Sequence, residues 1–352
     1  MKLTPKHKIS LLSLCAFAVT LLLSSCGGGG SSSNNGSSSG GGQSDVGGVN
    51  GRIVFSDGWD EPHTVSIVSV DIVNSKSQNL DVIGKGYGSH IGNNGNVVFV
   101  QNCNPSYNEQ LVIVDTNSLV TPISSCSDNL LGDYEYFSPK FSPNQKKIAV
   151  TIKGRFSGQY PIVAVFEIDK VDINTDLTKQ PSTKLFHGYN ASAWKPDGSL
   201  LLIGSGERLI LKEGPYGEVL EELPTIKHGI YVTDKNLNNP VRIENKINSP
   251  VYEPDVNKKG TKVTYSSLNN IFIMDIATGI PQKIRANTLS GIAHHPVWSP
   301  DGKYIAYAQQ DTYNYRQETI YFYELSSKNI LSIDLPDNEV KVDGPLSWIS
   351  IP

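Results

Sequence analysis

The stretch Trp298–Gln309, WSPDGKYIAYAQ, decides the fold because copies of it recur along the chain. Close copies are WKPDGSLLLIGS from Trp194 and FSPNQKKIAVTI from Phe141, and weaker ones are VNKKGTKVTYSS from Val256 and IGNNGNVVFVQN from Ile91. Each copy has a large apolar residue, a turn of the Pro-Asp-Gly type and a run of strand-forming residues, which together predict a β-hairpin. The copies therefore predict one hairpin that is repeated around the molecule.

A second pair of strand-like segments follows each hairpin, as in NIFIMDIATG at 270–279 followed by PQKIR at 281–285. The turn glycines, or the residues in their place, fall at 95, 145, 198, 260 and 302, so the units are spaced by 42 to 62 residues. Units of four strands at this spacing are typical of the blades of a β-propeller. Near-continuous apolar runs such as Ile162–Phe166 fit this fold, because neighbouring blades cover both faces of each sheet.

The two ends of the repeat region complement each other. GRIVFSDG at 51–58 has no inner strand before it, and GPLSWISIP at 344–352 resembles that missing strand. Placing residues 345–351 as the innermost strand of blade 1 closes the ring and leaves no unpaired edge. The sequence therefore predicts an all-β fold, a six-bladed β-propeller of four-stranded antiparallel blades over residues 49–352.

The first 25 residues have the pattern of an export signal, with three lysines before an apolar stretch at 9–23 that is short for a membrane span. Leu23–Cys26, LSSC, resembles the lipobox of bacterial lipoproteins, which implies cleavage before Cys26 and acylation of that cysteine, palmitate included. Ordinary cleavage nearby is the alternative. Gly27 in place of an aspartate resembles lipoproteins forwarded to the outer membrane, and the leaflet that the protein faces, periplasmic or cell-surface, stays open.

Residues 26–48 comprise the lipidated Cys26 and a Gly/Ser-rich tether. Ten glycines and seven serines among residues 27–48 offer too little apolar surface to offset the entropy of ordering, so we expect disorder there. The net charge is −4 for the whole chain and about −7 after removal of residues 1–25. This acidic balance argues against a nucleic-acid partner.

Two cysteines remain after processing. Cys15 leaves with the signal and Cys26 carries lipid, so Cys103 and Cys126 form an even pair in an oxidising compartment. They follow the second and the fourth predicted strand of blade 2, whose loops open on the same face of a propeller. A structural disulfide between them is the prediction.

The signature of residues 298–307, together with IFIMD at 271–275, resembles the TolB-type propeller repeat over roughly residues 50–352. This resemblance implies a propeller of six blades. TolB carries an α/β domain ahead of its blades, where this chain has the tether, so a link to the Tol system stays open. Peptidases with the same repeat need a serine in a nucleophile elbow, and neither Ser89 nor Ser205 has the flanking glycines.

Long aromatic loops follow the second strands of several blades, at 101–110, 153–161, 206–229 and 309–318. Loops on a rigid scaffold commonly carry recognition, and tyrosine, phenylalanine and arginine are enriched at interfaces. Ordinary anchoring of the loops is the alternative for each residue. The predicted partner-binding residues are Tyr107, Arg155, Phe156, Tyr160, Tyr216, Tyr313, Tyr315 and Arg316.

Histidines supply the sharpest alternative, because His294, His295, His187 and His90 all precede or begin predicted inner strands. A metal site needs three or four converging ligands, and no ring of ligand residues recurs in the repeat. Structural histidines are therefore favoured over a metal site at His294 and His295. That site would make the protein a channel-mouth enzyme resembling a polysaccharide lyase, and a carbohydrate-binding propeller is a related alternative.

The sequence as a whole predicts a non-catalytic, monomeric lipoprotein without a cofactor. Its propeller would bind envelope proteins, and its lipid would hold it at the outer membrane.

Overall fold

Antiparallel strands are the main elements of the computed structural model. The structure describes residues 48–58, 65–102, 109–124, 134–154, 161–173, 175, 177–206, 209–213, 219–223, 226–243, 249–284, 291–311, 318–333, 335 and 342–351. The chain divides into two units, residues 1–46 and 47–352, and every described residue belongs to the second. Within these described ranges, no helix has the length and apolar character needed to cross a membrane.

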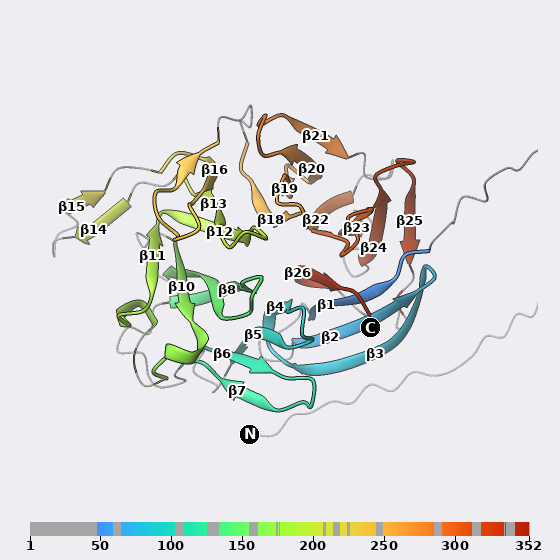
Figure 1. The fold of residues 1–352 in the computed structure, drawn as a ribbon, viewed down its shortest axis with the longest axis horizontal. Helices are drawn as coiled ribbons and strands as arrows, with labels where there is room; N and C mark the ends of the chain where they lie inside the picture. Colours follow the sequence, from blue (N-terminus) through green and yellow to red (C-terminus); the bar gives the residue numbers. More distant parts are fainter. Residues whose placement is uncertain are drawn as a thin grey trace, which may run out of the picture. The chain divides into compact units, whose positions relative to one another are not determined.

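Six sheets of four antiparallel strands form blades around a central axis (Figure 1). From the inner to the outer strand, blade 1 consists of β26 (Val342–Ile349), β1 (Gly51–Asp57), β2 (Ser66–Val73) and β3 (Lys76–Lys85), and blade 2 of β4 (Tyr87–Ile91), β5 (Val97–Asn102), β6 (Glu109–Val114) and β7 (Val120–Pro122). Blade 3 consists of β8 (Tyr134–Phe141), β9 (Lys147–Gly154), β10 (Ile162–Glu167) and β11 (Lys184–His187), with the short 3-10 helices η1 (Ile168–Lys170) and η2 (Leu177–Lys179) between its last two strands. Blade 4 consists of β12 (Tyr189–Trp194), β13 (Leu200–Gly204), β16 (Gly229–Val232) and β17 (Val241–Arg242). Blade 5 consists of β18 (Tyr252–Val256), β19 (Lys262–Ser267), β20 (Asn270–Asp275) and β21 (Pro281–Ile284), and blade 6 of β22 (Gly291–Trp298), β23 (Tyr304–Asp311), β24 (Glu318–Glu324) and β25 (Ile330–Ile333). The prediction of six four-stranded blades is confirmed.

The two ends of the propeller meet in blade 1, where β26 lies inside β1 (Figure 1). The strands run antiparallel, with Ile53 opposite Trp348 and Val54 opposite Ser347. The strand begins three residues before the predicted segment 345–351 and ends at Ile349. The C-terminal strand thus closes the ring, as the sequence predicts.

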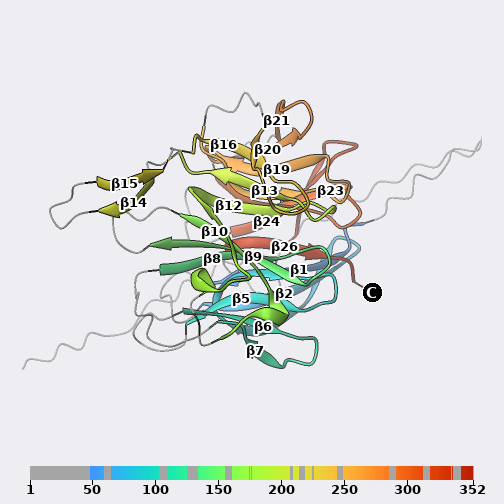
Figure 2. The same ribbon diagram turned by 60° about the vertical axis from the view of Figure 1, so that its left-hand side comes forward.

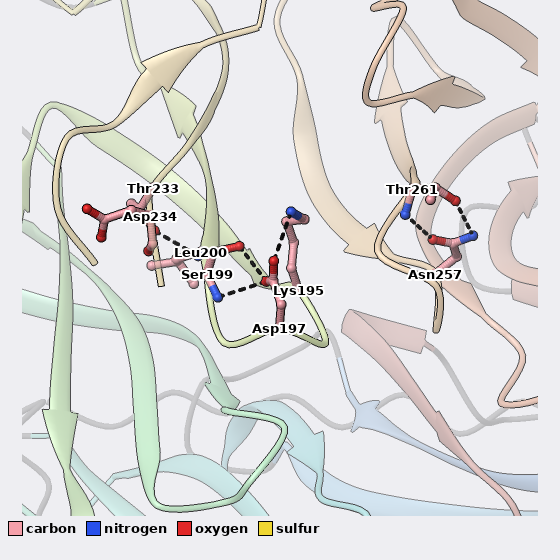
Figure 3. A network of polar contacts seen from close by, with 8 residues as sticks. All are labelled: Lys195, Asp197, Ser199, Leu200, Thr233, Asp234, Asn257 and Thr261. Carbon is pink, nitrogen blue, oxygen red and sulfur yellow. Dashed lines mark hydrogen bonds and ion pairs between the residues drawn. The ribbon is translucent and has the colours of Figure 1, made fainter. Parts of the chain in front are cut away.

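Glycines and acidic side chains fix the turn between the first and second strands of the blades. Gly198 and Gly302 have φ of 85° and 73°, in the left-handed region, and a Cβ at either would meet nothing within 4 Å. In blade 4, Asp197 Oδ1 accepts hydrogen bonds from the Ser199 amide (3.1 Å) and hydroxyl (2.6 Å), as Figure 3 shows. Gln145 occupies the glycine position in blade 3 with φ of 57°. The Pro-Asp-Gly residues therefore serve turn formation.

The apolar core is divided into clusters between neighbouring blades. In β10, five of the six residues are buried. Ala164 packs in a cluster with Val98 of blade 2, and the adjacent Val163 packs in a cluster with Leu202 of blade 4. Because successive strand residues point to opposite faces, both faces of the blade are covered, which explains its continuous apolar sequence.

An additional hairpin interrupts blade 4. Strands β14 (Leu209–Glu213) and β15 (Val219–Leu223) form a separate two-stranded sheet between β13 and β16. The hairpin projects away from the ring of blades (Figure 2). The sequence-based prediction of a loop over 206–229 is wrong for these two segments, which pair with each other in an antiparallel hairpin.

Candidate functional site: the central channel

A bulge with a left-handed residue interrupts five of the six inner strands. The left-handed residues are Gly88 (φ 63°), Ser138 (47°), Glu253 (51°), His295 (53°) and Gly344 (95°). A proline follows in four of these strands, β8, β18, β22 and β26. In blade 4 the register shift lies between Tyr189 and Ala191 instead, and β12 has no left-handed residue. The bulges bend the inner strands and re-aim the side chains that follow them.

The residue directly before the large apolar residue at the end of each inner strand is here called the ring position. In blades 1 to 6, the ring positions hold Ser347, His90, Lys140, Ala193, Asp255 and Val297. All except Ala193 line a cavity of about 640 Å³ in the channel. The cavity also contacts Glu253 and His295 on one side and the turn residues Asn93 and Lys258 on the other, so it extends from the bulges to the turns.

The ring-position side chains of blades 1, 2 and 5 each form a hydrogen bond to the following blade. Each accepts a hydrogen bond from the main-chain N–H of the residue after the ring position in the following blade: Ile91 to Ser347 Oγ (2.9 Å), Phe141 to His90 Nδ1 (3.4 Å) and Trp298 to Asp255 Oδ2 (2.8 Å). Buried main-chain N–H groups need such partners. The ring position therefore has a structural role wherever its side chain can accept a hydrogen bond.

Glu253 and His295 form a second link between blades 5 and 6. Glu253 Oε2 accepts a hydrogen bond from the His295 main-chain N–H (2.7 Å), and Glu253 Oε1 lies 2.7 Å from His295 Nδ1. The Ser266 hydroxyl donates to the same carboxylate (3.1 Å). Burial acts to raise the pKa of Glu253, but the charge and hydrogen bonds of His295, together with His294, lower it to about 2. The carboxylate is thus ionised at neutral pH and holds His295 in place.

The two adjacent histidines do not form part of a ligand cluster. Their rings pack edge to face with centroids 4.4 Å apart. His187 ends β11, the outer strand of blade 3, while His90 lies within β4. Over the described part of the chain, no group of three or more histidine, cysteine, aspartate or glutamate side chains is placed to hold a metal ion. His295 instead uses Nδ1 toward Glu253, which supports the structural interpretation of this residue.

Lys140 is the one lysine among the six ring positions. Its Nζ donates to the carbonyl of Pro254 (2.7 Å), so the side chain reaches from blade 3 to blade 5. Its own carbonyl accepts from Trp194 Nε1 (3.0 Å) of blade 4. Burial lowers the pKa of Lys140, and the charges of Asp255 and Glu253 oppose that effect.

The groups around Lys140 have shifted pKa values as well. Burial raises the pKa of Asp255, against the charge of Lys140 and hydrogen bonds from the amides of Trp298 and Val256. Burial and the charge of Lys140 lower the pKa of His90 to about 3. His90 is therefore neutral at physiological pH. Shifted pKa values that coincide with a cavity are a recognised mark of candidate functional sites.

Most residues predicted from the sequence lie outside the described ranges. These are Cys26, Cys103, Cys126, Tyr107, Arg155, Phe156, Tyr160, Tyr216, Tyr313, Tyr315 and Arg316. Their roles stay predictions. Of the predicted residues, the structure describes His294 and His295.

Sequence reasoning missed Lys140 and Asp255. A signal for them exists, because PKF at 139–141 and PDV at 254–256 place a charge directly before the apolar residue that opens each repeat copy. Blades 4 and 6 have Ala193 and Val297 at that position. A charge at a repeat position that is apolar in blades 4 and 6 is the feature that would have pointed to the channel.

A closed ring of six four-stranded antiparallel blades defines the class of the protein, a six-bladed β-propeller. Among solved structures, the chain is similar to TolB from Acinetobacter baumannii, with a TM-score of 0.56 and 14% identity over 85% of this chain and 66% of that one. It is also similar to a protein described as TolB from Agrobacterium tumefaciens (TM-score 0.50, 10% identity, 86% of this chain and 99% of that one). A chain of a nidogen/laminin complex has a TM-score of 0.53 and 9% identity over 84% of this chain and 97% of its own length.

These similarities show the fold alone. The chain spans slightly less than two thirds of the Acinetobacter TolB chain. No family model matches the sequence, and no curated protein matches it.

Proposed function

We propose that the protein is a non-catalytic envelope lipoprotein whose propeller binds other proteins. The lipobox at Leu23–Cys26 supports export and anchoring to the outer membrane by lipid at Cys26, and the Gly/Ser-rich segment after it would act as a tether. The TolB-like fold supports the choice of a propeller built for recognition. A chain of similar fold occurs in a nidogen/laminin complex, in which proteins are bound to one another.

One surface feature carries this proposal. Three large apolar side chains are exposed at the same end of blades 5 and 6: Tyr252 (51%), Leu268 (69%) and Ile292 (37%). Tyr252 and Ile292 lie at the starts of β18 and β22, and Leu268 lies in the turn between β19 and β20. We call these three residues the apolar edge. Apolar side chains that gather on a soluble surface are typical of protein-binding sites.

The apolar edge lies on the face of the propeller at which the second strands of the blades end. Tyr252 pairs with Ser266 across the strand pair, and the Ala293 amide donates to the Asn269 carbonyl (3.3 Å), so blades 5 and 6 meet at this edge. The aromatic loops leave the second strands at the same end as the turn that holds Leu268. We call this the loop face, and the opposite side, which carries the Pro-Asp-Gly turns, the turn face.

In-cell crosslinking followed by recovery of partners tests the proposed face. The triple change Tyr252→Ser, Leu268→Ser and Ile292→Ser should remove partners that the unchanged protein captures. Leu119→Ser is the matched control, because Leu119 is equally exposed (63%) but lies between β6 and β7, on the turn face. If the control variant lost partners that the triple variant kept, the loop face would not be the binding face.

A second variant examines the loop that the sequence singles out. Changing Tyr313, Tyr315 and Arg316 together to alanine should weaken the same crosslinks by removing aromatic and guanidinium anchors. An unchanged set of partners in the alanine variant would exclude that loop from the interface.

The double variant Cys103→Ser and Cys126→Ser tests the predicted disulfide. In the unchanged protein, reduction should expose additional free thiols, and in the double variant reduction should expose none.

Anchoring and the absence of catalysis have their own tests. Cys26→Ser should move the protein from the membrane fraction to the soluble fraction and abolish incorporation of labelled palmitate.

Metal analysis after purification without chelators should find no stoichiometric metal. A tightly bound metal that is lost on changing His294 and His295 would instead favour the metal-dependent enzyme.

A further inference from the structure

The ring position of blade 3 is not explained by ring closure. Ser347, His90 and Asp255 each accept the main-chain N–H of the next blade, whereas a charged lysine has no lone pair with which to accept it. Ala193 and Val297 show that blades 4 and 6 tolerate an apolar ring position. Placing an ammonium in a partly desolvated channel is unfavourable unless it is compensated. The links between blades therefore do not account for a lysine at position 140.

The ammonium of Lys140 is only partly engaged. One of its three protons is donated to the Pro254 carbonyl (2.7 Å). Asp255 and Glu253 act on it through space, but no ion pair shorter than 4.0 Å joins Lys140 to another described residue. Lys140 and Asp255 line the same cavity, so one ligand in that cavity is within reach of both charges.

We propose that the channel cavity binds a small zwitterion, with its carboxylate on Lys140 and its ammonium group on Asp255. The cavity of about 640 Å³ lies within the range of small-molecule sites, roughly 300 to 1,000 Å³, and suits an amino acid or a short peptide. The two protein charges would each gain a partner, which relieves the desolvation of both. The neutral His90 beside Lys140 adds no competing charge.

The site is separate from the proposed protein-binding face. Asn93, Lys258 and Pro300 belong to the turns and contact the cavity, so the ligand would enter from the turn face. The apolar edge lies on the loop face. The two proposals can therefore fail independently of each other.

Calorimetric titration of the full chain with glycylglycine and three analogues tests the proposal. N-acetylglycine keeps only the carboxylate, glycinamide keeps only the ammonium group, and N-acetylglycinamide has neither charge. Glycylglycine should bind at least tenfold more tightly than either singly charged analogue, and the neutral analogue should not bind. Equal binding of the neutral analogue, or no binding by glycylglycine, would overturn the proposal.

Two variants assign the two ends of the ligand. Lys140→Met should lose the preference for glycylglycine over glycinamide, and Asp255→Asn should lose the preference over N-acetylglycine while keeping an acceptor for the Trp298 amide. Lys146→Met is the control, because Lys146 is exposed in the first turn of the same blade. Circular dichroism and melting of each variant report whether it is folded. Folded variants that keep both preferences would contradict the assignment.

Discussion

The junction between blades 5 and 6 and the junction between blades 3 and 4 use the same strand position in opposite ways. In blade 5, Asp255 and Glu253 accept hydrogen bonds from the main chain of β22, and Glu253 also engages the side chain of His295. In blade 3, Lys140 offers blade 4 only its carbonyl, which accepts from Trp194. Blade 4 also lacks the left-handed bulge residue and carries the extra hairpin.

This difference shows how one repeat can divide closure and binding between its copies. A hydrogen-bond acceptor at the ring position binds the main-chain N–H of the next blade's inner strand and so links the two blades. A lysine at the same position cannot accept that hydrogen bond, so its ammonium group can interact with a ligand in the cavity. The blades 5 and 6 junction is therefore a structural clamp, and blade 3 holds the residue that we assign to a ligand.

Removal of the clamp should have the largest effect on stability. Glu253→Ala leaves the His295 amide without its acceptor and removes the carboxylate beside His295 Nδ1. Loss of one partner from this partly buried pair should lower the free energy of unfolding by about 2 kcal/mol. Urea denaturation at pH 7 measures it.

Glu167→Ala is the matched control for that experiment. Glu167 pairs with Lys170, whose side chain is 58% exposed, three residues away on the surface. Exposed ion pairs of this kind contribute little to stability, because water and salt screen them. If both variants lost the same amount of stability, the clamp would have no special role.

The pH dependence of stability should follow the same carboxylate. The pKa of Glu253 falls from 4.5 to about 2 on folding, so its contribution is complete above pH 4.5 and is lost as the pH falls toward 2. We expect about 2 kcal/mol to disappear over that range in the unchanged protein. Glu253→Gln should flatten this part of the profile, measured as the difference between the two unfolding curves at each pH. A parallel loss in both proteins would assign the effect to other carboxyl groups.

The sequence predicts the fold because the repeat places the same physical constraints in every blade. Pro-Asp-Gly turns at Gly198 and Gly302, apolar runs such as Ile162–Phe166 and the complementary ends each indicate the propeller, and the structure confirms all of them. These are local signals with known spacing.

The candidate site could not be predicted in the same way. Lys140 and Asp255 are 115 positions apart in the sequence and meet only because the ring brings blades 3 and 5 to one cavity. Glu253 reaches His295 through bulges whose left-handed residues are, in blades 3, 5 and 6, a serine, a glutamate and a histidine rather than glycines. Composition gives no warning of a positive φ at such residues. The adjacent histidines attracted attention for metal chemistry, while their carboxylate partner lies 42 residues away.

Substitution of the turn glycines should lower stability less than Glu253→Ala does. Gly302→Ala in blade 6 and Gly198→Ala in blade 4 should each cost about 1 kcal/mol, because alanine is strained at φ of 73° and 85° although nothing contacts its Cβ. Thermal melting of both variants should give similar shifts. Similar shifts would show that the turns of the two blades are equivalent and that their differences lie at the channel. A much larger loss in one blade would mean that its turn has a further role.

The smallest effect, and the sharpest contrast with Glu253, is expected at Lys140. Lys140→Met removes a desolvated charge and one hydrogen bond to the Pro254 carbonyl, while an apolar side chain of similar length fills its place. Replacement of a partly buried charge by an apolar residue is often neutral or stabilising, so we expect the free energy of unfolding to stay the same or rise by up to about 1 kcal/mol. Urea denaturation of this variant beside Lys146→Met measures the change. A loss near that of Glu253→Ala would make Lys140 a structural link between blades 3 and 5, because its bond to Pro254 would then be what holds the channel together.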